Sequence, residues 1–184
     1  MALMHTPICD FGWKAPAFSL VGLGGHTVTL EDVRGPAGTL LIFMCNHCPY
    51  VLAIADRLAN DVRALQALGI GVAAIMSNDY RAYPADAPDK MKAFHTEHGF
   101  TFDYLLDEDQ SVARAFGAVC TPDFFGFDSN LGLQYRGRID NSPMHAANAT
   151  ARELLSAMTS VAKTGKGPSE QRPSMGCSIK WRGM

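Results

Sequence analysis

The chain has 184 residues, of which 47% are hydrophobic and 18% charged, a composition typical of one globular domain with a sizeable core. The 16 basic and 18 acidic residues give a net charge of −2, which excludes the dense positive charge of a nucleic-acid or anionic-membrane surface. No stretch has the pattern of an export signal or the roughly 18 apolar residues of a membrane span. We therefore expect a cytoplasmic protein without a nucleic-acid or membrane partner.

Strand and helix signals alternate along most of the chain. A predicted hairpin of two short strands precedes three strand–helix units, a second hairpin and a last helix. Alternation predicts parallel strand pairs and the late hairpin adds antiparallel ones, so we expect an α/β fold with a central mixed β-sheet flanked by helices. The expected strands are 18–20, 27–30, 39–44, 70–76, 102–106, 124–127 and 133–138, and the expected helices are 49–68, 89–98, 109–116 and 147–163. We expect one domain over residues 1–184, with a core at about 14–163 and a linker and C-terminal tail at 164–184.

A C-x-x-C motif, Cys45-Asn46-His47-Cys48, joins the first buried strand to its helix. Two thiols three residues apart at a helix start lie on one side of the first turn, close enough to form a disulfide. The chain has five cysteines, an odd number in a chain too long to need a disulfide framework, which favours redox or metal-bound thiols. Because a helix N-terminus favours the thiolate, we expect Cys45 to be the accessible nucleophile with a lowered pKa and Cys48 to be the resolving thiol.

The order of these elements, with Thr121-Pro122 just before the second hairpin, resembles the thioredoxin superfamily. Residues 15–20, the extra strand–helix unit and residues 104–107 resemble its peroxiredoxin-like (alkyl hydroperoxide reductase/thiol-specific antioxidant) branch. Five segments are similar to a bacterial group of thioredoxin-like thiol-disulfide proteins: 45–51, 83–88, 120–125, 135–140 and 176–181. The resemblance implies a thioredoxin-like fold and a thiol-disulfide oxidoreductase without a cofactor. Its expected partners are protein or small-molecule disulfides and thiols, together with an electron donor that the sequence does not identify.

The resemblance also implies roles for residues around the two thiols. A histidine just before the second cysteine, here His47, resembles oxidising or isomerising relatives. A protonated imidazole beside a thiolate stabilises the reduced form and raises the reduction potential, whereas a His47 that points into solvent does neither. Thr121-Pro122 resembles the cis-proline that faces the C-x-x-C, where the backbone of the preceding residue pairs with an extended substrate. An ordinary trans turn is the alternative.

Two further cysteines have open roles. Cys120 is either a third redox thiol or a buried apolar cysteine. Cys177 lies in the tail, where Ile179 and Trp181 offer apolar anchors. We expect these anchors to dock the tail so that Cys177 lies near the redox face, and a free surface thiol is the alternative.

A peroxidase that uses Cys48 is the second hypothesis. Peroxiredoxins carry Pro-x-x-x-Thr/Ser-x-x-Cys, and aligning Cys48 with the last residue puts Leu41 at the proline and Cys45 at the hydroxyl position. Peroxide reduction needs that hydroxyl and a distal arginine to stabilise charge on the leaving oxygen. No arginine is evident near residues 120–122. Arg136 and Arg138 alternate along a predicted strand, which places both on its solvent face.

A soft-metal-binding module is the third hypothesis. Met44, Cys45, His47 and Cys48 offer ligands suited to Cu(I) or Zn(II), and Cys120 and Cys177 could join them. A C-x-x-C without a second pair at zinc-finger spacing predicts no structural zinc site, so we assign no metal ligand from the sequence.

Overall fold

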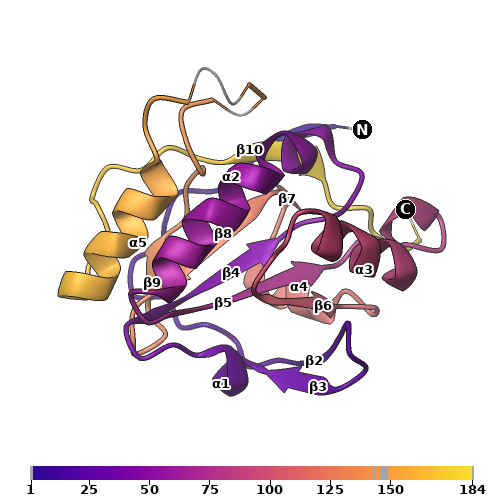
Figure 1. Cartoon of the computed structure of the whole chain (residues 1–184), viewed down its shortest axis with the longest axis horizontal. Coiled ribbons are helices and arrows are strands. Elements are labelled where there is room, and N and C mark those ends of the chain that lie inside the picture. The colour runs from indigo at the N-terminus through magenta and orange to yellow at the C-terminus, as the bar shows by residue number, and fades with distance from the viewer. Residues whose placement is uncertain (1, 143, 146–148, 184) are drawn as a thin grey trace.

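The computed structural model describes residues 2–142, 144–145 and 149–183 (Figure 1). The first half of the chain forms β1 (Leu3–His5), β2 (Ser19–Gly22), β3 (Thr27–Thr29), α1 (Leu30–Val33), β4 (Gly38–Phe43), α2 (Pro49–Gln66), β5 (Ile70–Met76) and a 3₁₀ turn, η1 (Pro84–Asp86). The second half forms α3 (Pro88–Glu97), β6 (Asp103–Leu106), α4 (Ser111–Phe116), β7 (Cys120–Thr121), β8 (Asp123–Phe127), β9 (Leu133–Tyr135), α5 (Glu153–Thr164) and β10 (Met175–Ser178).

The main sheet is mixed, as the alternation of elements predicted. Its strand order is β3-β2-β6-β5-β4-β8-β9. The central strand β5 pairs in parallel with β4 on one side and β6 on the other, whereas the remaining pairs are antiparallel. Every residue of β4 is buried, which is typical of a strand covered on both faces.

Helices cover both faces of this sheet and form two apolar cores. Leu40 and Ile42 of β4 pack with residues of α2, α3 and α5, and Leu41 and Phe43 pack with residues of α1 and α4. Successive side chains of a strand point to opposite faces, which explains this division. Figure 1 shows α2 and α5 side by side across one face of the sheet. Within the described residues, no helix has the length and apolarity needed to cross a membrane.

A second, small sheet joins the two ends of the chain. Its order is β1-β10-β7, so the C-terminal strand lies between the N-terminal strand and the strand before Pro122. Cys177 of β10 lies opposite Leu3 on one side and Thr121 on the other. Residues 164–184, predicted as a linker and tail outside the core, therefore contribute a strand to the fold. Ile179 is buried, and the prediction that apolar residues anchor this segment is confirmed.

Some predicted boundaries differ from the structure. The last helix begins at Glu153, while its predicted start, Ala147, lies outside the described residues. A short helix, α1, follows the first hairpin, because Thr29 caps the backbone N–H of Asp32 and the Asp32 carboxylate accepts the Thr29 N–H in return.

Arg136 is buried, contrary to the solvent-facing position predicted for it. Its guanidinium donates to Asp123 at 3.0 Å and lies 4.3 Å from the centre of the Phe125 ring. Burial raises the pKa of Asp123 to about 6, whereas the positive charge and hydrogen bond of Arg136 lower it. The prediction is wrong because β9 ends at Tyr135. The alternation of side chains between the two faces of a strand therefore does not extend to Arg136.

Candidate active site

The C-x-x-C segment lies between the end of β4 and the start of α2. Helix α2 begins at Pro49, and Cys48 is its N-cap residue with an extended backbone. The Cys48 carbonyl accepts the backbone N–H groups of Val51 and Leu52, each at 2.9 Å. Cys48, rather than Cys45, therefore lies beside the unpaired N–H groups and the positive end of the helix dipole.

The expectation that Cys45 is the accessible thiol with a lowered pKa is wrong in this structure. Cys45 is 1% exposed and Cys48 is 0% exposed, so neither side chain faces open solvent. The pKa of Cys48 is lowered to about 4, chiefly because the Cys45 thiol donates a hydrogen bond to it. The pKa of Cys45 is raised well above its ordinary value by the same hydrogen bond and by burial. The position of Cys48 at the start of α2 and these two pKa directions both favour ionisation of Cys48 over Cys45.

Other neighbours of Cys48 act in both directions. Its sulfur lies 3.1 Å from the Thr121 carbonyl oxygen, which accepts the thiol proton when Cys48 is neutral and so opposes ionisation. After Cys45, burial raises the Cys48 pKa, whereas the Cys177 thiol and backbone N–H and the Thr121 side chain lower it. The net direction is a lowered pKa.

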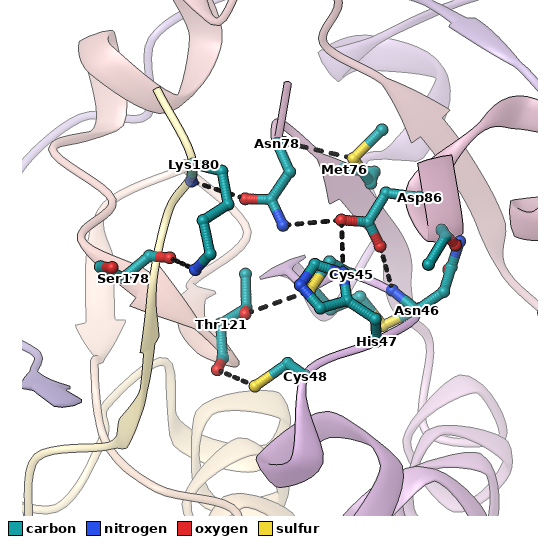
Figure 2. A network of polar contacts seen from close by, with 12 residues as sticks. Cys45, Asn46, His47, Cys48, Met76, Asn78, Asp86, Thr121, Ser178 and Lys180 are labelled. Atoms are coloured by element: carbon teal, nitrogen blue, oxygen red, sulfur yellow. Dashed lines mark hydrogen bonds and ion pairs between the residues drawn. The ribbon is translucent and has the colours of Figure 1, made fainter. Parts of the chain in front are cut away.

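Thr121 contacts both sulfurs, and its bond to Pro122 is cis, as the resemblance implied. The Thr121 hydroxyl lies 3.4 Å from the Cys45 sulfur, while its carbonyl contacts Cys48 (Figure 2). The structure thus brings the predicted pair, Thr121-Pro122, against the C-x-x-C across a separation of 76 residues in the chain.

His47 is held by a carboxylate instead of pointing into solvent. Its Nδ1 lies 2.8 Å from Asp86 Oδ2, and its ring stacks on Tyr83 at 5.8 Å between ring centres. The pKa of His47 is raised, chiefly by the hydrogen bond to Asp86. An imidazolium therefore forms more readily beside the two thiols than it would in water.

Asp86 is the functional residue that sequence reasoning missed. It is fully buried in η1, and its Oδ1 accepts the backbone N–H of Asn46 at 2.8 Å. Its Oδ2 accepts a hydrogen bond from the side-chain amide of Asn78 at 2.8 Å. The side-chain Oδ1 of Asn78 in turn accepts the backbone N–H of Lys180 at 2.9 Å. Figure 2 shows this chain of contacts running from the C-x-x-C loop to the C-terminal segment. The only sequence signal was an acidic residue within the prolyl segment 83–88.

Cys120 and Cys177 occupy different surroundings. Cys120 is buried, its sulfur lies 3.7 Å from the Pro122 carbonyl oxygen, and burial raises its pKa. This geometry is that of a buried apolar cysteine. Cys177 lies opposite Thr121, the residue that contacts both the Cys45 and Cys48 sulfurs, which confirms the prediction that the docked tail places it near the two thiols.

One group of possible metal ligands lies within the described residues. The Cys45 sulfur, a His47 ring nitrogen and an Asp86 carboxylate oxygen all lie within 4.8 Å of one another. His47 and Asp86 already form an ion pair, so a soft cation held by this group would have to replace that contact.

A pocket of about 300 Å³ lies beside the proline that faces the thiols. Its wall combines the first turns of α2, the start of β8 and the start of β10, and it also contains two arginines and one aspartate. The lining residues are His5, Tyr50, Ile54, Pro122, Phe124, Arg138, Ile139, Asp140, Arg172, Pro173, Ser174 and Met175. Such a wall suits an apolar group that carries some negative charge.

Comparison with known proteins agrees with this geometry. A family model described as the AhpC/TSA family matches residues 11–137. The chain belongs to the AhpC/TSA family. Among curated relatives, this AhpC/TSA member is 29% identical over 115 residues to "Putative peroxiredoxin MT2597" of Mycobacterium tuberculosis, covering 62% of this chain and 68% of the relative.

Solved structures extend the likeness to the whole chain. An uncharacterised conserved protein from Geobacillus kaustophilus is 39% identical, with a TM-score of 0.94 over 100% of this chain and 98% of the other. A hypothetical protein from Sinorhizobium meliloti is 36% identical, with a TM-score of 0.91 and 98% of both chains covered. The thioredoxin domain of a thiol-disulfide oxidoreductase from Bacteroides vulgatus is 18% identical, with a TM-score of 0.59 over 69% of this chain and 87% of the other, which shows the shared thioredoxin-like fold. The AhpC/TSA member described here is thus a thiol-based redox protein of that fold.

Proposed function

We propose that this protein is a thiol-disulfide oxidoreductase that cycles Cys45 and Cys48 between a dithiol and a disulfide, with Cys48 as the thiolate. The observation that carries the proposal is that one residue contacts both sulfurs: the Thr121 hydroxyl lies 3.4 Å from the Cys45 sulfur and its carbonyl oxygen 3.1 Å from the Cys48 sulfur. A thiolate oxidised at this position has the second thiol of the C-x-x-C on the same side of Thr121. An intramolecular disulfide is then the favoured product.

The environment of Cys48 favours an oxidising role. Each hydrogen-bond donor that stabilises the Cys48 thiolate stabilises the reduced protein. It gives no such stabilisation to the oxidised protein, because the disulfide contains no thiolate. Stabilisation of the reduced form raises the reduction potential. The raised pKa of His47 acts in the same direction, since it keeps a positive charge available beside the site.

The pocket beside Pro122 supports small or peptidic disulfides as substrates. Tyr50 and Met175 give it apolar walls, and Arg172 adds a positive charge, since Arg138 is paired with Glu153 and Asp140 with Arg57. A disulfide carrying one carboxylate would match both features. The partner that returns Cys45 and Cys48 to their starting redox state is a different molecule from this substrate.

A redox titration with mass-spectrometric disulfide mapping tests the proposal. The expected result is a reversible Cys45–Cys48 disulfide, with exchange activity on insulin lost in Cys45→Ser and Cys48→Ser and retained in Cys9→Ser. Cys9 provides the matched control because it is a partly buried cysteine that packs against the other apolar core. Absence of a reversible Cys45–Cys48 disulfide in the folded protein would contradict the proposal.

A peroxidase is the second candidate, favoured by the lowered pKa of Cys48 and by relatives named as peroxiredoxins. Against it, Cys45 stands where a peroxide-orienting hydroxyl would be. Within the described residues, the hydrogen bonds of the Cys45 and Cys48 sulfurs go to Thr121, and none goes to an arginine. Hydrogen peroxide turnover that is lost in Cys48→Ser and survives in Cys45→Ser would favour this candidate.

Soft-metal binding is the third candidate, favoured by the grouping of Cys45, His47 and Asp86. Elemental analysis of the purified protein, followed by titration of the reduced protein with Cu(I) and Zn(II), tests it. Stoichiometric metal that is lost in His47→Ala would support a metal site. Metal-free protein that still cycles its disulfide would support the oxidoreductase.

A further inference from the structure

Strand β10 occupies the edge of β7 directly before the cis-proline. Cys177 lies opposite Thr121, and Ser178 lies opposite Cys120, in an antiparallel pair. Thr121 is also the residue whose carbonyl and hydroxyl contact the two sulfurs of the C-x-x-C. An extended strand of this same chain, with a cysteine at its centre, therefore lies against the redox pair.

The register brings the Cys177 thiol to Cys48. Cys177 lies opposite Thr121, whose carbonyl oxygen is 3.1 Å from the Cys48 sulfur, and all three thiols belong to one apolar cluster. Cys177 is the most exposed of the three at 6%, compared with 1% for Cys45 and 0% for Cys48. Of the three buried thiols, Cys177 is thus the one nearest to solvent.

The backbones of β10 and β7 lie unusually close together at Gly176. A Cβ atom at Gly176 would lie 2.0 Å from the Thr121 carbonyl oxygen, so only glycine allows β10 this near to β7. Ser174 donates to the Pro122 carbonyl at 2.9 Å, and the Lys180 N–H donates to Asn78 at 2.9 Å. These contacts hold the strand on both sides of Cys177.

We propose that β10 is an internal substrate strand and that Cys177 exchanges with the Cys45–Cys48 disulfide to give a Cys48–Cys177 disulfide. This inference rests on the proposed oxidoreductase function and adds a third thiol to it. In the exchange, the Cys177 thiolate attacks the Cys48 sulfur, the Cys45–Cys48 bond breaks, and Cys45 takes up the proton that Cys177 released. One disulfide replaces another, so no external oxidant or reductant is needed. In the reverse direction the Cys45 thiolate attacks Cys48 and frees Cys177.

The charge state of the site makes this step depend on oxidation. Burial raises the pKa of Cys177 to about 11, and the next two contributions are its hydrogen bond to Cys48 and the negative charge of Cys48. Both of the latter exist only while Cys48 is a thiolate. Once Cys48 is in a disulfide they disappear, and Cys177 ionises more easily at the moment when it has a disulfide to attack.

Disulfide trapping in the full-length protein tests the proposal. Reduced wild type, Cys45→Ser and Cys9→Ser are equilibrated in glutathione buffers of graded potential, quenched with acid, alkylated and mapped by mass spectrometry. We expect Cys45→Ser to form an intramolecular Cys48–Cys177 disulfide. We expect wild type and Cys9→Ser to show this disulfide as a minor species beside Cys45–Cys48 at intermediate potentials.

Free Cys48 and Cys177 thiols in folded Cys45→Ser, at potentials where the wild-type pair is fully oxidised, would overturn the inference. If Cys45→Ser does not fold, judged by circular dichroism, wild type decides: absence of Cys48–Cys177 at every potential overturns the inference and its presence supports it. Failure of the proposed function is distinguishable, because it would remove Cys45–Cys48 from wild type as well.

Discussion

Asp86 Oδ2 lies 2.8 Å from His47 Nδ1, and the carboxylate of Asp86 is completely buried. The same carboxylate accepts the backbone N–H of Asn46 and the amide of Asn78. One buried acid therefore positions the histidine, fixes the C-x-x-C loop and, through Asn78, connects both to the C-terminal segment.

Asp86→Asn should lower the His47 pKa toward its ordinary value of about 6.5. The replacement removes the negative charge and turns one acceptor into a donor that faces the N–H groups of its neighbours. We expect a loss of about 1–3 kcal/mol in the free energy of unfolding, because buried donors lose their acceptor. An NMR titration of His47 and urea unfolding measure the two effects.

Asp56→Asn is the matched control, since Asp56 pairs with His98 at 2.8 Å but is 88% exposed. An exposed pair contributes about 0–1 kcal/mol, so this variant should unfold almost as wild type does. An unchanged His47 pKa in Asp86→Asn would refute the coupling between the two residues.

His47→Asn should make the reduction potential of the site more negative. The raised His47 pKa means that its positive charge persists to higher pH than usual and stabilises the Cys48 thiolate. The expected shift is on the order of 10–30 mV, where 30 mV corresponds to about 1.4 kcal/mol for a two-electron couple. The shift should be larger below the His47 pKa and should vanish above it, and glutathione titrations at two pH values measure it.

His26→Asn provides the control, because His26 is exposed in the first hairpin and belongs to neither apolar cluster. A His47→Asn protein with the wild-type potential at every pH would show that the imidazole has no part in tuning the thiols.

The reduced protein should lose stability on acidification through the ionisation of Cys48. The pKa of Cys48 falls from 9.0 to about 4 on folding, so the folded state holds fewer protons than the unfolded state between these values. The stabilisation is complete above the unfolded pKa and is lost as the pH falls toward about 4. Urea unfolding of reduced wild type and Cys48→Ala across this window should show their difference shrinking with decreasing pH.

Alkylation checks the same assignment by an independent route. Iodoacetamide should modify Cys48 before Cys45, at a rate that does not increase between pH 6 and pH 8, because Cys48 is already ionised there. Preferential labelling of Cys45, with a rate that rises through this range, would restore the sequence-based assignment of the two roles.

Gly176→Ala should separate β10 from β7, because its Cβ would lie 2.0 Å from the Thr121 carbonyl oxygen. We expect a loss of about 1–3 kcal/mol in the free energy of unfolding, typical of overpacking a close contact. We also expect faster alkylation of Cys48, since the strand that covers it is displaced. Gly22→Ala is the control: its nearest neighbours are side-chain atoms at 3.5 Å or more, and its effect should stay within about 0.5 kcal/mol.

Arg136→Met should cost about 3–5 kcal/mol, because it leaves Asp123 as an unpaired buried charge. Burial raises the pKa of Asp123 to about 6 although Arg136 lowers it, so removing Arg136 raises this pKa further. The stability deficit of the variant should therefore shrink as the pH falls toward about 6, because Asp123 is then protonated in both folded proteins. Arg81→Met, which breaks the exposed pair with Glu108, should cost no more than about 1 kcal/mol in the same unfolding assay.

The sequence by itself determined the layers of the fold and the approximate place of the thiols. Buried runs such as Gly38–Phe43 and the helical spacing after Pro49 are local patterns, and local periodicity is sufficient to assign them. The motif Cys45-Asn46-His47-Cys48 and the later Thr121-Pro122 could be identified from the sequence because each consists of only a few consecutive residues. The resemblance then predicted that the two segments meet, and the structure confirms the contact.

Tertiary structure alone decided what surrounds each thiol and so the direction in which its pKa shifts. The helix begins one residue after Cys48, and the spacing of apolar residues does not locate a helix start with that accuracy. Asp86 and Cys177 reach the site from segments 38 and 129 residues beyond Cys48, brought there by burial and by strand pairing. The pKa of a thiol depends on the donors and charges within a few ångströms of it, and those neighbours are set by how distant segments pack.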